Sequence, residues 1–209
     1  MDNTEENAYE SDQYELAASS IEESFEESED TYIPFFSYKK IKGVLEDIFE
    51  KDSLSVAIST EKFLVFGTHW GHIHVIDLKG NISKSWHTHR AAVTSLACTK
   101  SNDFLISGGD DGKVVLHDFF SESRKVVADH QRPVKAVSID PNYTATEGKI
   151  VSGGLLEQLI VHEERKWPLG KRDLILDEGN GAIHTISWNN NLLAVANEKV
   201  SIYTLSLFF

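Results

Sequence analysis

A group of histidines lies between positions 69 and 89 of the 209-residue sequence. His69, His72 and His74 form an H-x-x-H-x-H pattern, and His87 and His89 follow shortly after it. Imidazole nitrogens bind zinc, so this cluster could indicate a zinc site. In strand geometry, however, His72 and His74 share a face while His69 lies across a turn, and no cysteine or acidic residue stands at ligand spacing. We therefore expect structural histidines and assign no metal-binding residue.

The stretch "GGDDGK", residues 108–113, has the composition of a phosphate-binding loop. The pattern GxxxxGK[ST] would need a glycine at position 107 and Ser or Thr at position 114, where the chain has Ser107 and Val114. The sequence also lacks a G-x-S-x-G elbow and a Cys/His pair at a recognised spacing. It therefore predicts a protein that is not an enzyme, with no catalytic residue and no cofactor.

The same glycine-containing phrase recurs along the chain. Gly67, Gly108 and Gly153 are 41 and 45 residues apart, and Ala196 follows 43 residues later. A period of roughly 40 to 45 residues is typical of the four-stranded blades of a β-propeller. Because one blade cannot bury both of its faces, blades are repeated until neighbours cover one another.

Each repeat contains the material for four strands. The glycine lies between two short apolar runs, and an acidic residue stands ten positions after it: Asp77, Asp118 and Glu163. Leading runs such as "AVTSLACT" and trailing runs such as "RKVVADH" supply the other two strands, with the alternation of half-buried strands. His117 and His162 stand in the same position before the acid, which indicates repeat packing rather than a catalytic base.

Glycines of the repeat are expected to have structural roles. Gly108–Gly109 and Gly153–Gly154 should let the backbone turn where the strands crowd toward the propeller axis. The dipeptide Asp111-Gly112 predicts a two-residue type I′ hairpin turn, because glycine accepts positive φ without steric cost.

Charge is concentrated at the start of the chain. Residues 1–30 hold 12 of the 33 acidic residues and no Lys or Arg, so their charge is −12, whereas the remaining residues sum to −1. We expect a disordered acidic tail at 1–32 and the propeller at 33–209, because such a tail cannot bury enough apolar surface to order. The tail is either a solubilising arm or a docking arm for a basic partner. The neutral body lacks the basic footprint of a nucleic-acid-binding protein.

No targeting or membrane segment is evident in the sequence. The acidic, polar start is the reverse of a signal peptide, and no apolar run is long enough to span a membrane. The single cysteine, Cys98, lies in an apolar run, cannot form an intrachain disulfide and is expected in the core. These features predict a cytoplasmic protein without a transmembrane segment.

Several stretches resemble known sequences. "SGGDDGKVVLHD" resembles the WD-repeat phrase, with His117-Asp118 where that family has Trp-Asp. More specifically, "KFLVFGTHWGHIHVIDLKGN", residues 62–81, resembles the first-blade signature of the vacuolar protein sorting-associated protein 41 family. Residues 152–188 and 193–203 are also similar to that family, with Gly179-Asn180-Gly181 in place of its Gly-Glu-Gly and Val195 in place of a Trp.

The resemblance implies an all-β, WD40-like β-propeller that acts as a non-enzymatic protein-interaction module of the HOPS tethering complex. It implies a role in vesicle-mediated protein transport and fusion at the late endosome, lysosome or vacuole. The implied partners are other HOPS subunits and a late-endosomal or vacuolar Rab GTPase, with peripheral attachment to the membrane through partners. The alternative is a generic WD-repeat scaffold, such as a ubiquitin-ligase substrate receptor. Partner-contacting residues are not identified.

The number of repeats predicts an incomplete propeller. About four blade periods fit between residues 33 and 209, whereas closed propellers commonly have up to eight blades. Family members continue into an α-solenoid and usually a RING domain, so we expect a fragment, a splice form or a truncated gene model. Two uncovered blade faces should make the purified chain self-associate, which light scattering would detect.

Deletion of residues 1–30 is expected to leave the melting temperature nearly unchanged. A disordered acidic arm contributes few packing contacts, so we expect a shift of no more than about 2 °C. Thermal unfolding of the full and shortened chains measures the effect. A fall of several degrees would show that the tail packs on the blades.

Overall fold

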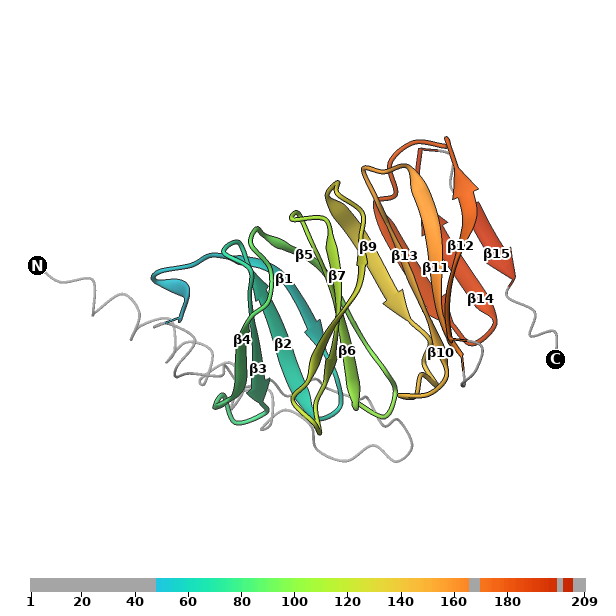
Figure 1. Ribbon diagram of the computed structural model, residues 1–209. Helices are drawn as coiled ribbons and strands as arrows, with labels where there is room; N and C mark the ends of the chain where they lie inside the picture. Colours follow the sequence, from blue (N-terminus) through green and yellow to red (C-terminus); the bar gives the residue numbers. More distant parts are fainter. Residues whose placement is uncertain (1–47, 166–169, 199–200, 205–209) are drawn as a thin grey trace, which may run out of the picture. The chain divides into compact units, whose positions relative to one another are not determined.

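The structure, a computed structural model, describes residues 48–165, 170–198 and 201–204. The predicted tail at 1–32 lies outside these residues. The described strands form four antiparallel sheets in chain order (Figure 1), three with four strands and the last with three. Sheet 1 contains β1 (Leu54–Ser59), β2 (Phe63–Thr68), β3 (His72–Asp77) and β4 (Ile82–His87); sheet 2 contains β5 (Val93–Cys98), β6 (Phe104–Gly109), β7 (Lys113–Asp118) and β8 (Arg124–Asp129). Sheet 3 contains β9 (Val134–Ile139), β10 (Gly148–Gly154), β11 (Gln158–Arg165) and β12 (Gly170–Glu178); sheet 4 contains β13 (Thr185–Asn189), β14 (Leu192–Ala196) and β15 (Ser201–Thr204).

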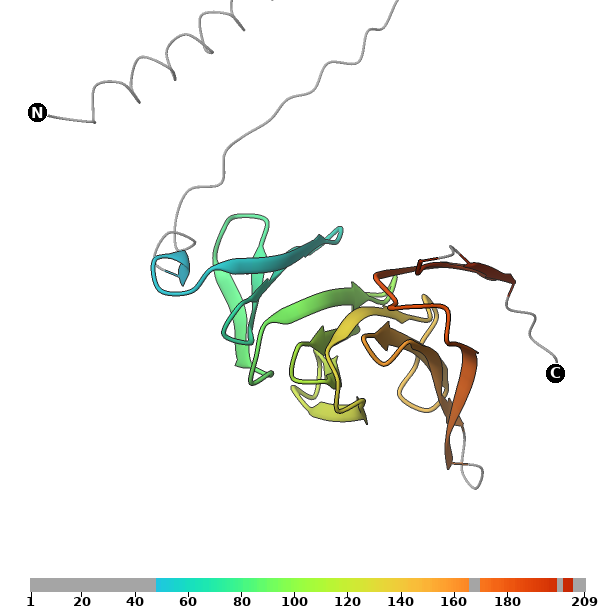
Figure 2. The ribbon, with the colours of Figure 1, turned by 90° about the horizontal axis from the view of Figure 1, so that it is seen from above.

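The sheets are arranged as the blades of a β-propeller, which confirms the predicted fold class. Figure 2 shows them side by side along a curve, with sheets 1 and 4 at its two ends. Each consecutive pair of the inner strands β1, β5, β9 and β13 is in contact. The inner strands of the first three sheets also share a β-bulge, at Ser55, Thr94 and Lys135. A repeated bulge gives each blade the same local bend and twist.

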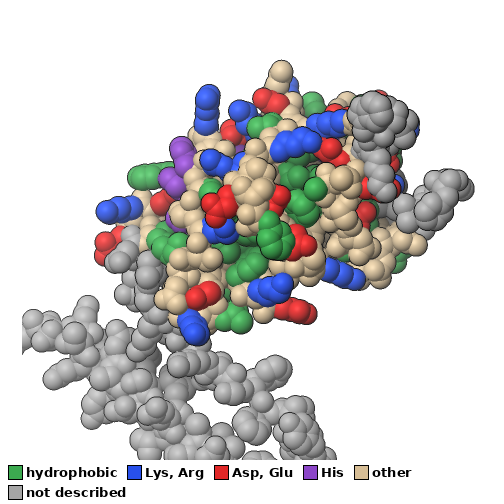
Figure 3. All heavy atoms as spheres, turned by 60° about the horizontal axis from the view of Figure 1, so that its bottom comes forward, with side chains coloured by type: hydrophobic (Ala, Val, Ile, Leu, Met, Phe, Trp, Pro, Cys, Tyr) green, Lys and Arg blue, Asp and Glu red, His purple; other side chains and the backbone are tan. Residues whose placement is uncertain are grey.

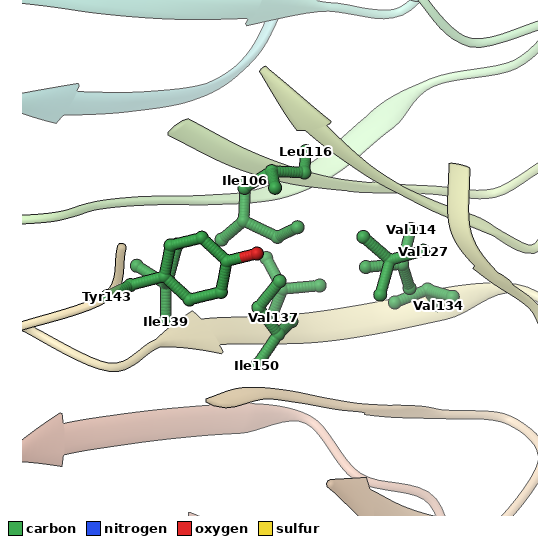
Figure 4. Packing of buried hydrophobic residues seen from close by; sticks show 9 residues of the cluster. All are labelled: Ile106, Val114, Leu116, Val127, Val134, Val137, Ile139, Tyr143 and Ile150. Atoms are coloured by element: carbon green, nitrogen blue, oxygen red, sulfur yellow. The ribbon is translucent and has the colours of Figure 1, made fainter. Parts of the chain in front are cut away.

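The hydrophobic core is divided among the spaces between neighbouring sheets. Three clusters of buried residues fill these spaces, one between sheets 1 and 2, one between sheets 2 and 3, and one between sheets 3 and 4. In the middle cluster, Val114, Val127 and Val134 gather at one end, whereas Ile139 and Tyr143 lie at the other (Figure 4). Every internal sheet is therefore covered on both faces, as the repeat predicted.

Gly108 and Gly153 lie inside strands β6 and β10, and Gly109 and Gly154 are the last residues of these strands, so the predicted turning of the backbone at these positions is wrong. The predicted crowding is confirmed, because an added Cβ at Gly108 would lie 2.8 Å from Val134 and one at Gly153 would lie 2.7 Å from Ile183. Glycine is needed here because the segment that begins the next sheet approaches the backbone closely.

The predicted type I′ turn at Asp111-Gly112 is also wrong. Three residues, 110–112, connect β6 to β7, and the Gly112 N–H donates to the Gly109 carbonyl at 3.1 Å. Gly112 has a φ of +83°, and Asp111 is not among the residues with positive φ. This is the three-residue hairpin in which a turn is followed by one left-handed residue.

Replacement of Gly112 with Val is expected to lower the free energy of unfolding by about 1 to 2 kcal/mol, because a β-branched residue is strained at positive φ. The added Cβ would also lie 3.1 Å from the backbone nitrogens of Gln131 and Arg132. Urea titration measures the loss, and Gly112→Asn, which tolerates the left-handed region, should lose less. An unchanged midpoint for Gly112→Val would contradict this account of the turn.

Replacement of Glu157 with Gly is expected to stabilise the protein. Glu157 occupies the corresponding left-handed position in the turn between β10 and β11, with a φ of +59° and its N–H bonded to Gly154 O at 3.1 Å. Removing the side chain relieves the strain of positive φ at some entropic cost, for a net gain of about 0.5 to 1 kcal/mol. A urea midpoint that does not rise would show that Glu157 is not strained.

Candidate functional site

A buried hydrogen-bond network joins four side chains of sheet 2 and the segment before it. His89 Nε2 lies 2.9 Å from Ser107 Oγ, and Ser107 Oγ lies 3.1 Å from His117 Nε2. At the other end, His89 Nδ1 lies 2.9 Å from Asp111 Oδ1. The His89 backbone N–H donates to Gly71 O at 3.1 Å, which fixes the connection from β4 to β5 at this point. The network therefore links sheet 2 to sheet 1.

The protons of this network can be assigned from Asp111. A carboxylate only accepts, so His89 Nδ1 donates to it. Burial lowers the pKa of His89, even though Asp111 opposes this effect, so the ring is neutral and its Nε2 accepts from the Ser107 hydroxyl. Ser107 Oγ then accepts from His117 Nε2, and His117 Nδ1 is left buried without a partner. Burial lowers the pKa of His117 to about 3, which keeps this ring neutral.

Ser107, His89 and Asp111 have the distances of a catalytic Ser-His-Asp triad. A serine nucleophile must reach its substrate, and here Ser107 is completely buried while His89 is only 1% exposed. The indole ring of Trp86 from sheet 1 stacks over His117, with ring centroids 5.0 Å apart. The arrangement holds two blades together and gives no substrate access to the hydroxyl.

Sheet 3 contains a second network of the same kind. Ser152 Oγ lies 2.9 Å from His130 Nε2 and 2.8 Å from His162 Nε2. Here the carboxylate comes from the outer strand β12, with Asp173 Oδ1 2.9 Å from His162 Nδ1. The His130 N–H donates to Gly112 O at 2.9 Å, just as His89 does to Gly71 O. The prediction that His117 and His162 serve repeat packing is confirmed.

The two networks run in opposite directions. In sheet 3 the Asp173 carboxylate accepts from His162 Nδ1, so His162 Nε2 accepts from Ser152, and Ser152 accepts from His130. In sheet 2 the Ser107 hydroxyl donates instead to His89, the histidine that precedes the inner strand β5. The carboxylate lies on the hairpin turn in sheet 2 (Asp111) and on the outer strand in sheet 3 (Asp173). Its position therefore decides which of the two histidines donates a hydrogen bond to the serine.

Sheet 1 holds no such network. The residues aligned with Ser107 and His117 are Phe66 and Ile76, which are apolar. Sequence reasoning missed the role of His89, which it grouped with histidines expected to be structural, and the role of His130. A signal was present in the sequence, because a histidine precedes the serine by 18 residues in one repeat and by 22 in the next.

The remaining histidines of the predicted cluster lie on sheet 1. His72 and His74 share a face of β3, as expected, and the ring of His72 stacks on that of His87 at 4.6 Å. His74 Nδ1 lies 3.0 Å from Ser85 Oγ, and burial lowers its pKa. Across residues 48–165, 170–198 and 201–204, no group of three or more His, Cys, Asp or Glu side chains is placed to hold a metal ion.

Cys98 lies at the end of β5, where it packs against the cluster between sheets 1 and 2. Burial raises the pKa of its thiol to about 11. A thiol with such a pKa stays protonated at neutral pH and is a poor nucleophile.

An exposed tryptophan stands at the turn between β2 and β3. Trp70 is 63% exposed, and its backbone N–H donates to Asp52 Oδ1 at 3.2 Å. The N–H of His69 donates to Ser53 O, and that of Gly71 donates to Thr68 O. A large aromatic side chain held on a rigid backbone is the kind of group that anchors protein–protein contacts. This turn is the candidate interaction site, in the same segment as the sequence signature at 62–81.

The face of the molecule shown in Figure 3 gives little support for binding to a polyanion. On the face shown in Figure 3, Lys and Arg side chains alternate with Asp and Glu, and hydrophobic side chains lie between them. Such mixed charge produces no extended positive field. In the part of the chain that the structure describes, no helix is long and apolar enough to cross a membrane.

Comparison with known proteins identifies relatives over most of the chain. Residues 36–207 match the family model Beta-prop_Vps41, described as the Vps42 beta-propeller. The "Vacuolar protein sorting-associated protein 41 homolog" of Arabidopsis thaliana is 33% identical over 81% of this chain and 17% of that protein. The homolog of Solanum lycopersicum is 34% identical over 83% of this chain and 18% of that protein. The chain thus spans less than a fifth of the length of these two relatives.

A solved structure supports the fold independently. The β-propeller domain of Myceliophteria thermophila Cps50 (Swd1) superposes with a TM-score of 0.62 over 72% of this chain and 52% of that chain, at 15% identity. At this identity the likeness concerns the fold alone. The family model covers most of the sequence, including all four described sheets. The chain therefore belongs to the Vps41 β-propeller family.

Proposed function

We propose that this chain is a non-enzymatic protein-interaction module that acts in vacuolar protein sorting. The relatives that carry "vacuolar protein sorting-associated" in their names match it over four-fifths of its length. The serine and histidine of both Ser-His-Asp groups are buried within the blades, which favours a structural over a catalytic role. The observation that carries the proposal is the match at 36–207, which includes the exposed turn of Trp70.

The finer proposal is membership of a HOPS-type tethering complex. Its partners would be other HOPS subunits and a late-endosomal or vacuolar Rab GTPase. Through these partners the chain would attach peripherally to the membrane of the late endosome, lysosome or vacuole. The alternative role as a ubiquitin-ligase substrate receptor is less well supported, because the family match is specific to Vps41.

Trp70 is the residue that we place in the partner contact. Its side chain is 63% exposed and stands between two exposed or half-exposed neighbours, His69 and His72. Tryptophan is enriched among the few residues that supply most of the energy of an interface. Truncation of Trp70 should therefore weaken binding without a loss of fold.

Purified components test the proposal. The chain is immobilised and probed separately with each HOPS subunit, with the Rab in its GTP and GDP states, and with a ubiquitin-ligase adaptor as the comparison. Binding to a HOPS subunit or to the Rab supports the function, whereas binding to the adaptor alone overturns it. Trp70→Ala should reduce that binding at least about tenfold. Phe120→Ala, which removes an aromatic side chain that is 82% exposed on the turn between β7 and β8, is the matched control.

A further inference from the structure

The connection between β12 and β13, residues 179–184, contains Asn180, the one asparagine of the sequence that a glycine follows. In an Asn-Gly pair the backbone nitrogen of the glycine can attack the side-chain amide carbon of the asparagine. Glycine favours this attack because it has no side chain to obstruct the approach and adopts a wide range of backbone conformations. The geometry around Asn180 and Gly181 therefore decides whether the chain can modify itself here.

The backbone of this connection is fixed near both ends and open between them. The Gly179 N–H donates to Glu157 O, and the Ile183 N–H donates to Gly154 O, each at 3.1 Å. Between these two bonds, the Gly181 N–H has no acceptor among the residues that the structure describes. Gly181 has a φ of +85°, which glycine adopts without steric strain. The nitrogen that would attack is therefore not engaged in a hydrogen bond to the described residues.

The amide that would be attacked is restrained by a carboxylate. The half-buried Asn180 donates from Nδ2 to Asp177 Oδ1 at 2.6 Å, and Asn197 Nδ2 lies 3.5 Å from Asp177 Oδ2. A hydrogen bond to an ionised carboxylate is stronger than one between neutral groups. It fixes the plane of the amide, so it limits the rotation that brings the face of Cγ toward the Gly181 nitrogen. Asp177 therefore slows the attack.

We propose that Asn180 is a site of spontaneous deamidation that Asp177 restrains. The Gly181 nitrogen loses its proton and bonds to Asn180 Cγ, while the bond from Cγ to Nδ2 breaks and Nδ2 leaves as ammonia with that proton. The product is a five-membered succinimide ring. Water from the solvent then hydrolyses one of the two carbonyl–nitrogen bonds of the ring, which leaves aspartate or isoaspartate at position 180. The reaction needs no oxidant or reductant, and the chain gains one negative charge.

The new carboxylate would lie among other carboxylates. It replaces a donor with an acceptor opposite Asp177 Oδ1, so the original hydrogen bond cannot form again. A Cβ on Gly181 would lie 2.9 Å from Glu198 Oε2, which shows that another carboxylate lies beside this turn. Like charges at such distances repel one another. We expect the turn to shift together with Ile183, which is 1% exposed and packs on Gly153 between sheets 3 and 4.

One tryptic peptide supplies both the measurement and its internal controls. Cleavage after Arg172 and Lys199 releases residues 173–199, which contain Asn180 and four other asparagines: Asn189, Asn190, Asn191 and Asn197. The full chain is incubated at mildly alkaline pH and digested, and fragmentation of the peptide locates each change from amide to acid. A sample digested at once corrects for conversion during digestion. We expect Asn180 to convert first. No conversion at Asn180, or earlier conversion of another asparagine, would overturn the proposal.

Two neighbouring carboxylates test the restraint. Asp177→Ala removes the acceptor of the Asn180 bond, so conversion at Asn180 should become about tenfold faster. Glu178→Ala is the matched control, because this carboxylate accepts from Gln158 Nε2 instead. Its rate should stay close to that of the wild type. Equal rates in the two variants would show that Asp177 does not restrain the amide. Circular dichroism confirms that both variants are folded.

Asn180→Asp reproduces the aspartate product and tests its effect on the boundary between sheets 3 and 4. We expect the Ile183 N–H to exchange with solvent about tenfold faster and the Tm to fall by about 2 to 4 °C. Asn190→Asp, at an exposed position on the turn between β13 and β14, is the matched control and should change neither quantity. If Ile183 exchanges no faster in Asn180→Asp than in this control, the proposed effect on the boundary is wrong.

Discussion

Replacement of His89 with Ala is expected to lower the free energy of unfolding by about 3 kcal/mol, among the largest effects of any single change outside the apolar core. The imidazole is 1% exposed, so its removal leaves a cavity between sheets 1 and 2. It also removes a partner from Ser107 Oγ and from Asp111 Oδ1, both of which lie 2.9 Å from the ring. A buried polar group left without a partner costs about 1 to 3 kcal/mol by itself.

Urea titration of the wild type and of three variants measures this effect. His69→Ala, at an exposed position, should change the free energy of unfolding by less than about 0.5 kcal/mol. Asp111→Asn should fall between the two, because the amide oxygen still accepts from His89 while the charge is lost. If His89→Ala costs no more than His69→Ala, the network does not contribute to holding the two blades together.

The repeat could be predicted from the sequence because its pattern recurs in each blade. The spacing of Gly67, Gly108 and Gly153 and the alternation of the flanking runs are local patterns, and each predicted strand is present. The acidic residues ten positions after these glycines do not all lie at equivalent places in their strands. Asp77 and Asp118 are at strand ends and accept backbone N–H groups of the following turn, whereas Glu163 lies inside the longer strand β11.

The networks could not be predicted in the same way, because they depend on the register between segments far apart in the chain. Asp111 was identified only as a turn residue, and its contact with His89 requires the connection before β5 to bond to Gly71. In sheet 3 Leu156 stands at the position of Asp111 on the corresponding turn, and the carboxylate of the network comes instead from Asp173 on β12. The contact between Asp173 and His162 can be recognised only when the pairing of β12 with β11 is known.

The turn of Trp70 likewise combines a feature that the sequence predicted with one that it did not. The stretch around it was singled out for its resemblance to a family, but sequence alone could not say which of its side chains are exposed. Thr68 is completely buried, and Trp70, two residues later, is 63% exposed. The difference arises because β2 ends at Thr68 and the turn then directs the next side chains outward.

Lowering the pH from 7 to 5 is expected to cost about 4 kcal/mol of stability from His117 and His130 alone. Burial, together with the neighbouring His89 and Arg124, lowers the pKa of His117 to about 3, and burial with His162 lowers that of His130 to about 4. In the unfolded chain both rings take up protons near their ordinary pKa of 6.5. Their contribution is therefore complete above pH 6.5 and is lost progressively as the pH falls toward the folded values.

The carboxylates affect the stability of the protein in a different pH range. The pKa values of Asp77, Asp111 and Asp118 are lowered from 3.8, so their contributions persist above that value and are lost only at lower pH. Between pH 5 and pH 6 the slope of stability against pH therefore reports the buried histidines. Each histidine that is neutral in the folded state adds somewhat more than about 1 kcal/mol per pH unit to this slope, because the unfolded ring is largely protonated in this range.

The double variant His117→Gln/His130→Gln distinguishes the pH dependence that these two rings cause from the loss of stability that any change in packing would cause. The side-chain amide of Gln can donate to Ser107 and Ser152 in place of Nε2, but it does not titrate. The variant should be less stable at pH 7, and its slope between pH 5 and pH 6 should be lower by roughly 2 kcal/mol per pH unit. Urea titrations at several pH values measure both quantities. An unchanged slope would mean that these two histidines are not the groups that unfolding protonates.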